Sequence, residues 1–239
     1  MKLSDFKVLT FDCYGTLIDW ETGMFQALSP LLDRVKQPLG KDQVLEAHSR
    51  HEHAQEGWTP TRHYSDLLAT VYKRLAEEWG VAASWEDALA YGQSIGSWPA
   101  FPDSADALAY LKQHYRLAVL SNVDNASFAR SNARLKVPFD AIYTAEDIGS
   151  YKPSPRNFEY MLEKLKTLGL AKKDVLHTAQ SLFHDHGPAN AIGLANCWID
   201  RRHDRGGGFG ATVKPPVEPK YDFRFTSLAE LVEAHRGGG

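Results

Sequence analysis

The residues best suited to chemistry lie directly after short apolar runs. The run 8–11 leads straight into Asp12, and Gly15 and Thr16 follow within four residues. An aspartate at the end of a buried strand is a candidate covalent nucleophile. Backbone N–H groups in a tight turn at Gly15 would steady a developing negative charge. Considered alone, Asp12 is equally compatible with a simple capping role for the next segment.

Polar residues also follow three later apolar runs. Ser121 and Asn122 end the second, Lys152 comes shortly after the third, and the fourth leads into a cluster that contains Ser181, His184 and Asp185. Each signal is weak alone, since a Ser-Asn pair favours turns and a lone lysine is usually solvated. A lysine close to Asp12 would keep the carboxylate ionised and steady anionic groups of a substrate.

Five apolar runs are expected to form the buried strands that position these residues. They are 8–11, 117–120, 141–143, 175–178 and 196–199. Helical patterns separate most of them, for example 104–114, 126–135 and 157–168. This alternation predicts an α/β fold, a Rossmann-like parallel sheet with helices on both faces. The Gly- and Pro-containing segment 205–219 is expected to be a surface loop before a last strand and helix.

The segment 20–98 interrupts the alternation of strands and helices. It has no convincing strand but shows helical patterns at 24–35, 42–55, 64–79 and 85–95. We therefore predict a helical cap domain at 20–98, inserted into a catalytic core formed by 1–19 and 99–239. Such an insertion would lie over the crevice where open α/β sheets bind ligands, which is the position of a lid.

Composition and charge restrict the class of protein. The 27 basic and 30 acidic residues give a formal net charge of −3, so nucleic-acid binding is not expected. No apolar run approaches the roughly 20 residues that cross a bilayer, and the N-terminus lacks the pattern of a signal peptide. Cys13 and Cys197 are too few for a disulfide framework. We expect a reduced, cytoplasmic protein that does not bind membranes.

The four groups of polar residues, in this order, resemble the motifs of the haloacid dehalogenase superfamily. These motifs are Phe11-Asp12-x-Tyr14-Gly15-Thr16-Leu17, Leu120-Ser121-Asn122, Lys152-Pro153 and the cluster after the fourth strand. The resemblance covers essentially the whole chain, including a helical cap between the first and second strands. It implies a hydrolase that forms a covalent ester on Asp12.

Residues within the motifs favour one branch of this superfamily. In its Mg²⁺-dependent phosphatases the nucleophile motif is Asp-x-Asp-Gly-Thr, whose second aspartate is a general acid, whereas this chain has Tyr14. Acids after strand four hold the metal in those enzymes, and an alignment places Gln180 and His184 there, which are poor Mg²⁺ ligands. The Asp-x-Tyr-Gly-Thr form resembles the type II branch, the 2-haloacid dehalogenases.

This resemblance implies hydrolysis of short 2-haloalkanoic acids without a metal or an organic cofactor. Asp12 would displace halide from carbon, and water would then hydrolyse the ester at its carbonyl carbon. Thr16 and Lys152 would orient Asp12 and balance its charge. Contacts to the substrate and the halide are expected from Tyr14, Arg50 of the cap, Ser121, Asn122 and Ser181.

One departure from the family concerns the group that activates the hydrolytic water. The usual motif after strand four is Ser-Asn-x-x-Asp, whereas Ser181 is followed by His184 at the acid position, with Asp185 one residue later. Either His184 is the base, or a local shift lets Asp185 act; the family's chemistry favours Asp185. A tyrosine usual six residues after the lysine is Phe158 here, which removes one polar contact.

The cap also carries a group of histidines. His48, His51 and His53, with Glu52, resemble metal ligands, but their spacing lacks the i, i+4 histidine pairing of metalloenzyme helices. A polar helix face toward the active site is the preferred interpretation. Two other functions stay open, a phosphatase of the same superfamily and a catalytically silent member that binds a small acid or a protein. The resemblance also suggests a homodimer.

Overall fold

A six-stranded sheet forms the centre of the computed structural model, which describes residues 1–205 and 212–238. Every neighbouring pair of strands is parallel, in the order β3-β2-β1-β4-β5-β6. The predicted Rossmann-like parallel sheet is confirmed, and the five predicted strands lie within one residue of their expected bounds. The strands are β1 (Val8–Phe11), β2 (Arg116–Ser121), β3 (Ala141–Thr144), β4 (Val175–Ala179), β5 (Asn196–Ile199) and β6 (Phe223–Phe225).

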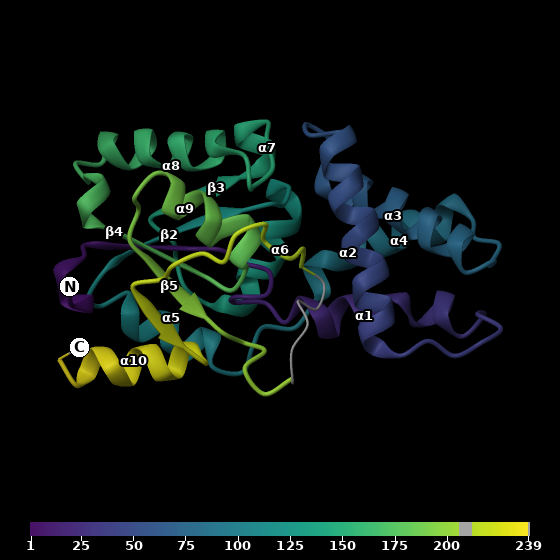
Figure 1. The fold of residues 1–239 in the computed structure, drawn as a ribbon, viewed down its shortest axis with the longest axis horizontal. Coiled ribbons are helices and arrows are strands. Elements are labelled where there is room, and N and C mark those ends of the chain that lie inside the picture. Colours follow the sequence, from purple (N-terminus) through teal and green to yellow (C-terminus); the bar gives the residue numbers. More distant parts are fainter. Residues whose placement is uncertain (206–211, 239) are drawn as a thin grey trace.

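Helices cover both faces of the sheet because successive strand residues point into two separate apolar layers. Leu9 packs in the layer under α5 (Ser104–Leu111), α6 (Asn125–Leu135) and α10 (Leu228–Arg236). Its neighbour Val8 packs in the opposite layer, under α7 (Ala145–Ile148), α8 (Pro155–Thr167) and α9 (Gly187–Ala191). Figure 1 shows α7 and α8 along one side of the sheet and α5 and α10 along the other.

A helical insert leaves the core after β1 and returns before β2, as the sequence predicts. It contains α1 (Trp20–Leu32), α2 (Lys41–Trp58), α3 (Tyr64–Glu78), α4 (Trp85–Gln93) and the short η2 (Ser94–Ser97). Figure 1 shows these helices grouped beside the sheet. The outgoing and returning chains pair side by side, since Asp19 N donates to Pro99 O (2.8 Å) and Phe101 N donates to Leu17 O (3.0 Å). We propose the division between core and cap at this crossing.

The parallel direction of the strands brings the polar residues to one edge of the sheet. Asp12 follows β1, Ser121 ends β2 and Gln180 follows β4, so their side chains lie at the carboxyl edge under the insert. The predicted loop 205–219 lies partly outside the described residues, at 206–211, and 212–219 contain neither helix nor strand. No helix in the ranges 1–205 and 212–238 combines the length and apolar character needed to cross a membrane.

The insert depends on close packing of α3 against α4 at Gly92. A Cβ at Gly92 would overlap the carbonyl oxygen of Ser65, a backbone atom that cannot rotate away. Gly92→Ala is therefore expected to lower the free energy of unfolding by about 1–3 kcal/mol. The matched control is Gly57→Ala on α2, where an added Cβ meets nothing within 4 Å. Thermal unfolding that gives the same melting temperature for both variants would contradict this packing.

Candidate active site

Asp12 sits where β1 ends and the chain turns sharply. Its backbone N–H donates to Thr178 O of β4 (3.1 Å), which holds the residue against the neighbouring strand. Gly15 adopts φ +95°, a left-handed conformation that favours glycine, and a Cβ there would lie 2.9 Å from Trp20 Nε1. The turn therefore needs glycine for its backbone angle as well as for space. It leaves Asp12 only 6% exposed at the cavity described below.

Both oxygens of the Asp12 carboxylate accept hydrogen bonds from residues that the sequence singled out. Thr16 Oγ1 donates to Oδ2 (2.7 Å), and Lys152 Nζ donates to Oδ1 (2.8 Å). Thr16 Oγ1 in turn accepts from the backbone N–H of Gln180 (2.9 Å). The carboxylate is thus held by Thr16 and Lys152, and through Thr16 it is linked to Gln180 after β4.

Lys152 is almost completely buried and donates three hydrogen bonds. Besides Asp12, its Nζ contacts Asp185 Oδ1 (2.7 Å) and the backbone oxygen of Leu120 (3.1 Å). Asn122 holds the backbone of the lysine from both sides. Its Oδ1 accepts from Lys152 N (2.7 Å), and its Nδ2 donates to Lys152 O (3.0 Å). The Asn122 amide therefore positions the cation.

Asp185 is brought to Lys152 by the short π-helix η4 (Leu182–His186). A π-helical turn adds a residue to the usual helical spacing, and this supplies the local shift that the sequence left open between His184 and Asp185. His177 Nε2 lies 2.9 Å from the same Asp185 oxygen, and His177 Nδ1 lies 2.9 Å from Thr10 Oγ1. Asp185, and not His184, thus contacts the lysine that contacts Asp12.

Burial and charge set the protonation of these groups. Burial, together with the charge of Asp185, raises the pKa of Asp12 above its ordinary value, against the opposing effect of Lys152 and Thr16. Burial opposes the charged form of Lys152, but the two carboxylates more than offset it and raise the pKa of the ammonium. Burial also acts on Asp185, yet Lys152 and His177 hold the pKa of Asp185 well below its ordinary value. Of the two carboxylates, Asp12 is therefore the one that takes up a proton first.

His184 lies beside this group and faces the cap. Ser181 Oγ accepts from the His184 backbone N–H (3.0 Å) and lies 3.2 Å from His184 Nδ1. The other ring nitrogen, Nε2, lies 3.7 Å from Glu56 Oε2 of α2. Burial favours the neutral imidazole, but Glu56 outweighs it and raises the pKa of His184. Ser181 therefore orients His184 toward an acid of the cap.

A small cavity of about 50 Å³ joins these groups at the boundary between cap and sheet edge. That is room for a few water molecules, so a ligand enclosed here must be small. Three buried polar atoms in its lining, Ser121 Oγ, His184 Nε2 and Asp185 Oδ2, have no hydrogen-bond partner within the described part of the chain. The lining consists of Asp12, Tyr14, Trp20, Glu52, Glu56, Tyr64, Ser121, Asn122, Lys152, Ser181, His184, Asp185 and Thr212.

Two residues that were expected to contact the substrate or the halide, Tyr14 and Arg50, direct their polar groups to other partners. The Tyr14 ring lines the cavity, but its hydroxyl lies 2.9 Å from Ser131 Oγ. Arg50 does not line the cavity: its exposed guanidinium donates to both oxygens of Glu78 (2.9 and 3.1 Å). The reason is the phase of the helix, because a residue two positions before Glu52 lies on nearly the opposite face of α2.

The sequence reasoning did not single out Glu56 and Tyr64 of the cap or His177 of the core. Glu52 and Glu56 are four residues apart on α2, so both face the cavity, and Tyr64 OH donates to Glu52. Such an i, i+4 pair of acids beside a lid is a signal that could have been recognised. For His177 the signal was an imidazole in a short strand whose other residues are mostly apolar.

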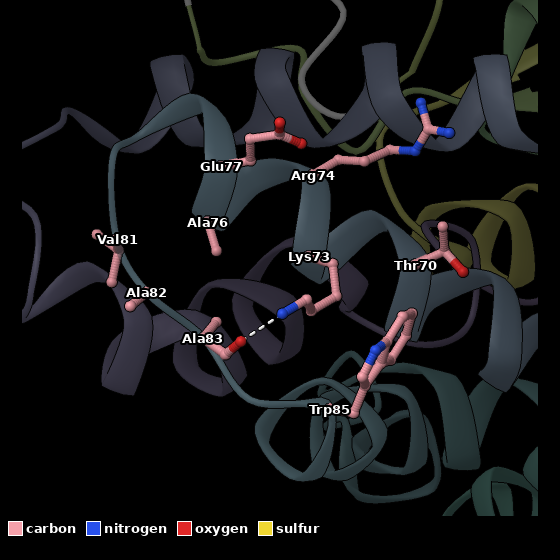
Figure 2. Close-up of a pocket in the computed structure, with 9 residues that line it drawn as sticks. All are labelled: Thr70, Lys73, Arg74, Ala76, Glu77, Val81, Ala82, Ala83 and Trp85. Atoms are coloured by element: carbon pink, nitrogen blue, oxygen red, sulfur yellow. Dashed lines mark hydrogen bonds between the residues drawn. The ribbon is translucent and has the colours of Figure 1, made fainter.

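A larger hollow of about 640 Å³ lies on the cap alone, between α3 and the chain that leads into α4. Figure 2 shows Lys73 reaching the backbone oxygen of Ala83 beside Trp85. Its nine lining residues all lie between Thr70 and Trp85, away from the carboxyl edge of the sheet. The candidate site is therefore the smaller cavity at Asp12.

Comparison with known proteins found relatives that are similar in sequence or in fold. An (S)-2-haloacid dehalogenase of Xanthobacter autotrophicus is 26% identical over 214 residues, which cover 82% of this chain and 75% of that protein. The HAD-hydrolase YfnB of Bacillus subtilis is 25% identical over 204 residues, covering 82% and 84%. A solved L-2-haloacid dehalogenase from Xanthobacter autotrophicus, with chloropropionic acid covalently bound, has a TM-score of 0.76 at 19% identity, covering 98% and 100%. This structural likeness shows the fold.

The family assignment rests on a match over most of the chain. The model of the haloacid dehalogenase-like hydrolases matches residues 6–182, from before β1 to the start of η4. That range contains Asp12, Ser121 and Lys152, which the structure brings to one edge of the sheet. The chain belongs to the haloacid dehalogenase-like hydrolases.

Proposed function

We propose that this hydrolase cleaves the carbon–halogen bond of a short 2-haloalkanoic acid to give a hydroxy acid and halide. The observation that carries the proposal is the Asp12 carboxylate at a cavity for small molecules, paired with Lys152 and Thr16. The solved relative with covalently bound chloropropionic acid supports the same chemistry.

In the first step an oxygen of Asp12 attacks the carbon that carries the halogen. A carbon–oxygen bond forms, and the electrons of the carbon–halogen bond leave with the halide. Lys152 supports this step because it keeps the buried carboxylate ionised, and Thr16 fixes its orientation. The leaving halide needs no proton, which accords with Tyr14 two residues after the nucleophile, where phosphatases of the superfamily have an acid.

In the second step water attacks the carbonyl carbon of the ester on Asp12. We propose that Asp185 takes the proton from this water, since its Oδ2 is buried and has no partner among the described residues. The bond between the ester oxygen and the Asp12 carbonyl carbon breaks, and the product leaves with that oxygen, which takes the proton back from Asp185 to become the alcohol. Asp12 is regenerated as a carboxylate when its own acid proton passes to solvent. Lys152, which contacts both carboxylates, balances the charge that moves between them.

Substrate binding is assigned to the polar groups of the cavity wall. Ser121 Oγ, unpartnered among the described residues, is proposed to donate to the substrate carboxylate. The ammonium group of Lys152 lies in the described lining, so we propose that Lys152, in place of Arg50, attracts the anionic substrate. Tyr14 and Trp20 supply the aromatic wall beside the leaving halide.

The donor set does not fit a magnesium-dependent phosphatase. Mg²⁺ requires several oxygen ligands in octahedral geometry. Asp12 and Asp185 each give one oxygen to the ammonium of Lys152, and the residue after β4 is Gln180, a neutral amide. No step of the proposed reaction uses this ion.

Asp12→Asn is expected to reduce halide release by roughly 10³-fold or more, because an amide cannot displace halide from carbon. The assay measures chloride released from (S)-2-chloropropionate, with and without a chelator, and runs p-nitrophenyl phosphate with Mg²⁺ in parallel. Full turnover by the variant would overturn the proposal. So would a wild-type chain that releases phosphate only with Mg²⁺ and releases no halide.

Asp185→Asn is expected to slow hydrolysis of the ester by about 10²- to 10⁴-fold and to leave halide displacement largely intact. Mass spectrometry of the peptide that contains Asp12, after exposure to (S)-2-chloropropionate, should then show a persistent mass gain. His184→Gln is the comparison variant and should not accumulate the ester. If the ester accumulates in His184→Gln instead, His184 is the base.

The rate of halide displacement is expected to fall on the acid side at a pH above the ordinary pKa of aspartate, which is about 3.9. Burial raises the pKa of Asp12, and only the ionised form attacks, so activity is present above that pKa and is lost below it. Since the pKa of Lys152 is raised, this lysine should cause no loss of rate below about pH 10. A single-turnover pH profile with an acid midpoint at or below about 3.9 would contradict this.

A further inference from the structure

Three potential metal ligands from the cap and the core meet at the rim of the active-site cavity. His53 and Glu56 lie one turn apart on α2, and His184 lies on η4. One ligand atom from each side chain lies within 4.8 Å of the other two. The group joins two parts of the chain that are separate in sequence, and Glu56 and His184 also line the cavity.

His184 is held in an orientation that suits a metal ligand. Its Nδ1 lies 3.2 Å from Ser181 Oγ, and with the proton on Nδ1 the other nitrogen carries a lone pair. That nitrogen, Nε2, is buried and makes no hydrogen bond within the described part of the chain. Metal-bound histidines are usually fixed in this way, through a hydrogen bond from the ring nitrogen that does not bind the ion.

Glu56 and His53 also lie close to His184. Asn122 Nδ2 donates to Glu56 Oε1 (3.2 Å), so Oε2 is the oxygen that faces His184 Nε2, 3.7 Å away. The exposed His53 ring packs edge-on against Phe183, 5.3 Å between centroids, and Phe183 packs in the same way against the His184 ring. The aromatic ring of Phe183 thus contacts both imidazoles.

We propose that His53, Glu56 and His184 form a binding site for a divalent transition-metal ion of the Zn²⁺ type that joins the cap to the core. Two imidazole nitrogens and one carboxylate oxygen are a set that Zn²⁺ accepts, with a fourth position left for water or another ligand. With bonds of about 2.0–2.1 Å, tetrahedral ligands lie about 3.3 Å apart, so small rotations of these side chains complete the site. Mg²⁺ prefers oxygen ligands and is not expected to bind here.

The site has a consequence for the cap that does not depend on the proposed reaction. Helix α2 supplies two ligands and η4 supplies the third, so a bound ion would hold the insert against the sheet edge. Binding of the ion to the folded chain alone would also raise its thermal stability. The proposed ligands do not include Asp12, Lys152 or Asp185, so binding of the ion can be measured separately from the proposed displacement of halide.

Isothermal titration calorimetry of the full, chelator-treated chain with ZnCl₂ tests the site. One ion should bind per chain, and His53→Ala and Glu56→Gln should each weaken binding by about tenfold or more. The matched control is His51→Ala, a histidine of the same helix whose Nε2 contacts Glu78 (2.6 Å), and its affinity should equal that of the wild type. MgCl₂ should give no binding heat.

Thermal unfolding supplies a second measurement. Zn²⁺ should raise the melting temperature of the wild type and of His51→Ala but not that of His53→Ala, whose replaced side chain is exposed and not needed for folding. Absence of saturable Zn²⁺ binding by the wild type would overturn the proposal. Equal affinity of the wild type and His53→Ala would also overturn it, since the ion would then bind elsewhere.

Discussion

A buried ammonium group must be compensated, because removal of one charge from water costs several kcal/mol. Lys152 meets this requirement with two carboxylates and a backbone oxygen, and the positions of all three depend on the sheet. Asp12 comes from the end of β1, Leu120 from β2, and Asp185 from the turn after β4. The charge balance of the site therefore exists only when these segments are assembled side by side.

This arrangement also explains how two similar carboxylates can do different work. Both contact the same lysine, but Asp185 has His177 as a second hydrogen-bond partner, while Asp12 has a threonine. The pKa of Asp185 is held low and that of Asp12 is raised, so the two environments make these pKa values differ. The two acids therefore differ in environment, although both contact Lys152.

The insert supplies the outer wall of the cavity. Its helix α2 presents Glu52 and Glu56 inward, held by Tyr64 and Asn122 respectively, and turns Arg50 outward to Glu78. Glu56 of this wall raises the pKa of His184 and is also one of the three ligands proposed for a transition-metal ion. The cap is thus the part in which this chain departs most from what its motifs imply.

The sequence by itself determined the parallel sheet, the helical insert and the order of the nucleophile, serine, lysine and acid motifs. Apolar strands with polar ends are local patterns, and parallel strands must bring such ends to one edge. Only the tertiary structure decided that Asp185 contacts Lys152. The π-helix η4 adds one residue to the ordinary helical spacing, and the sequence did not predict this. The tertiary structure also decided that Glu56, and not Arg50, lines the cavity. The face that α2 turns toward the cavity depends on how the helix packs against α3 and the core, and the spacing of residues within α2 does not determine this packing.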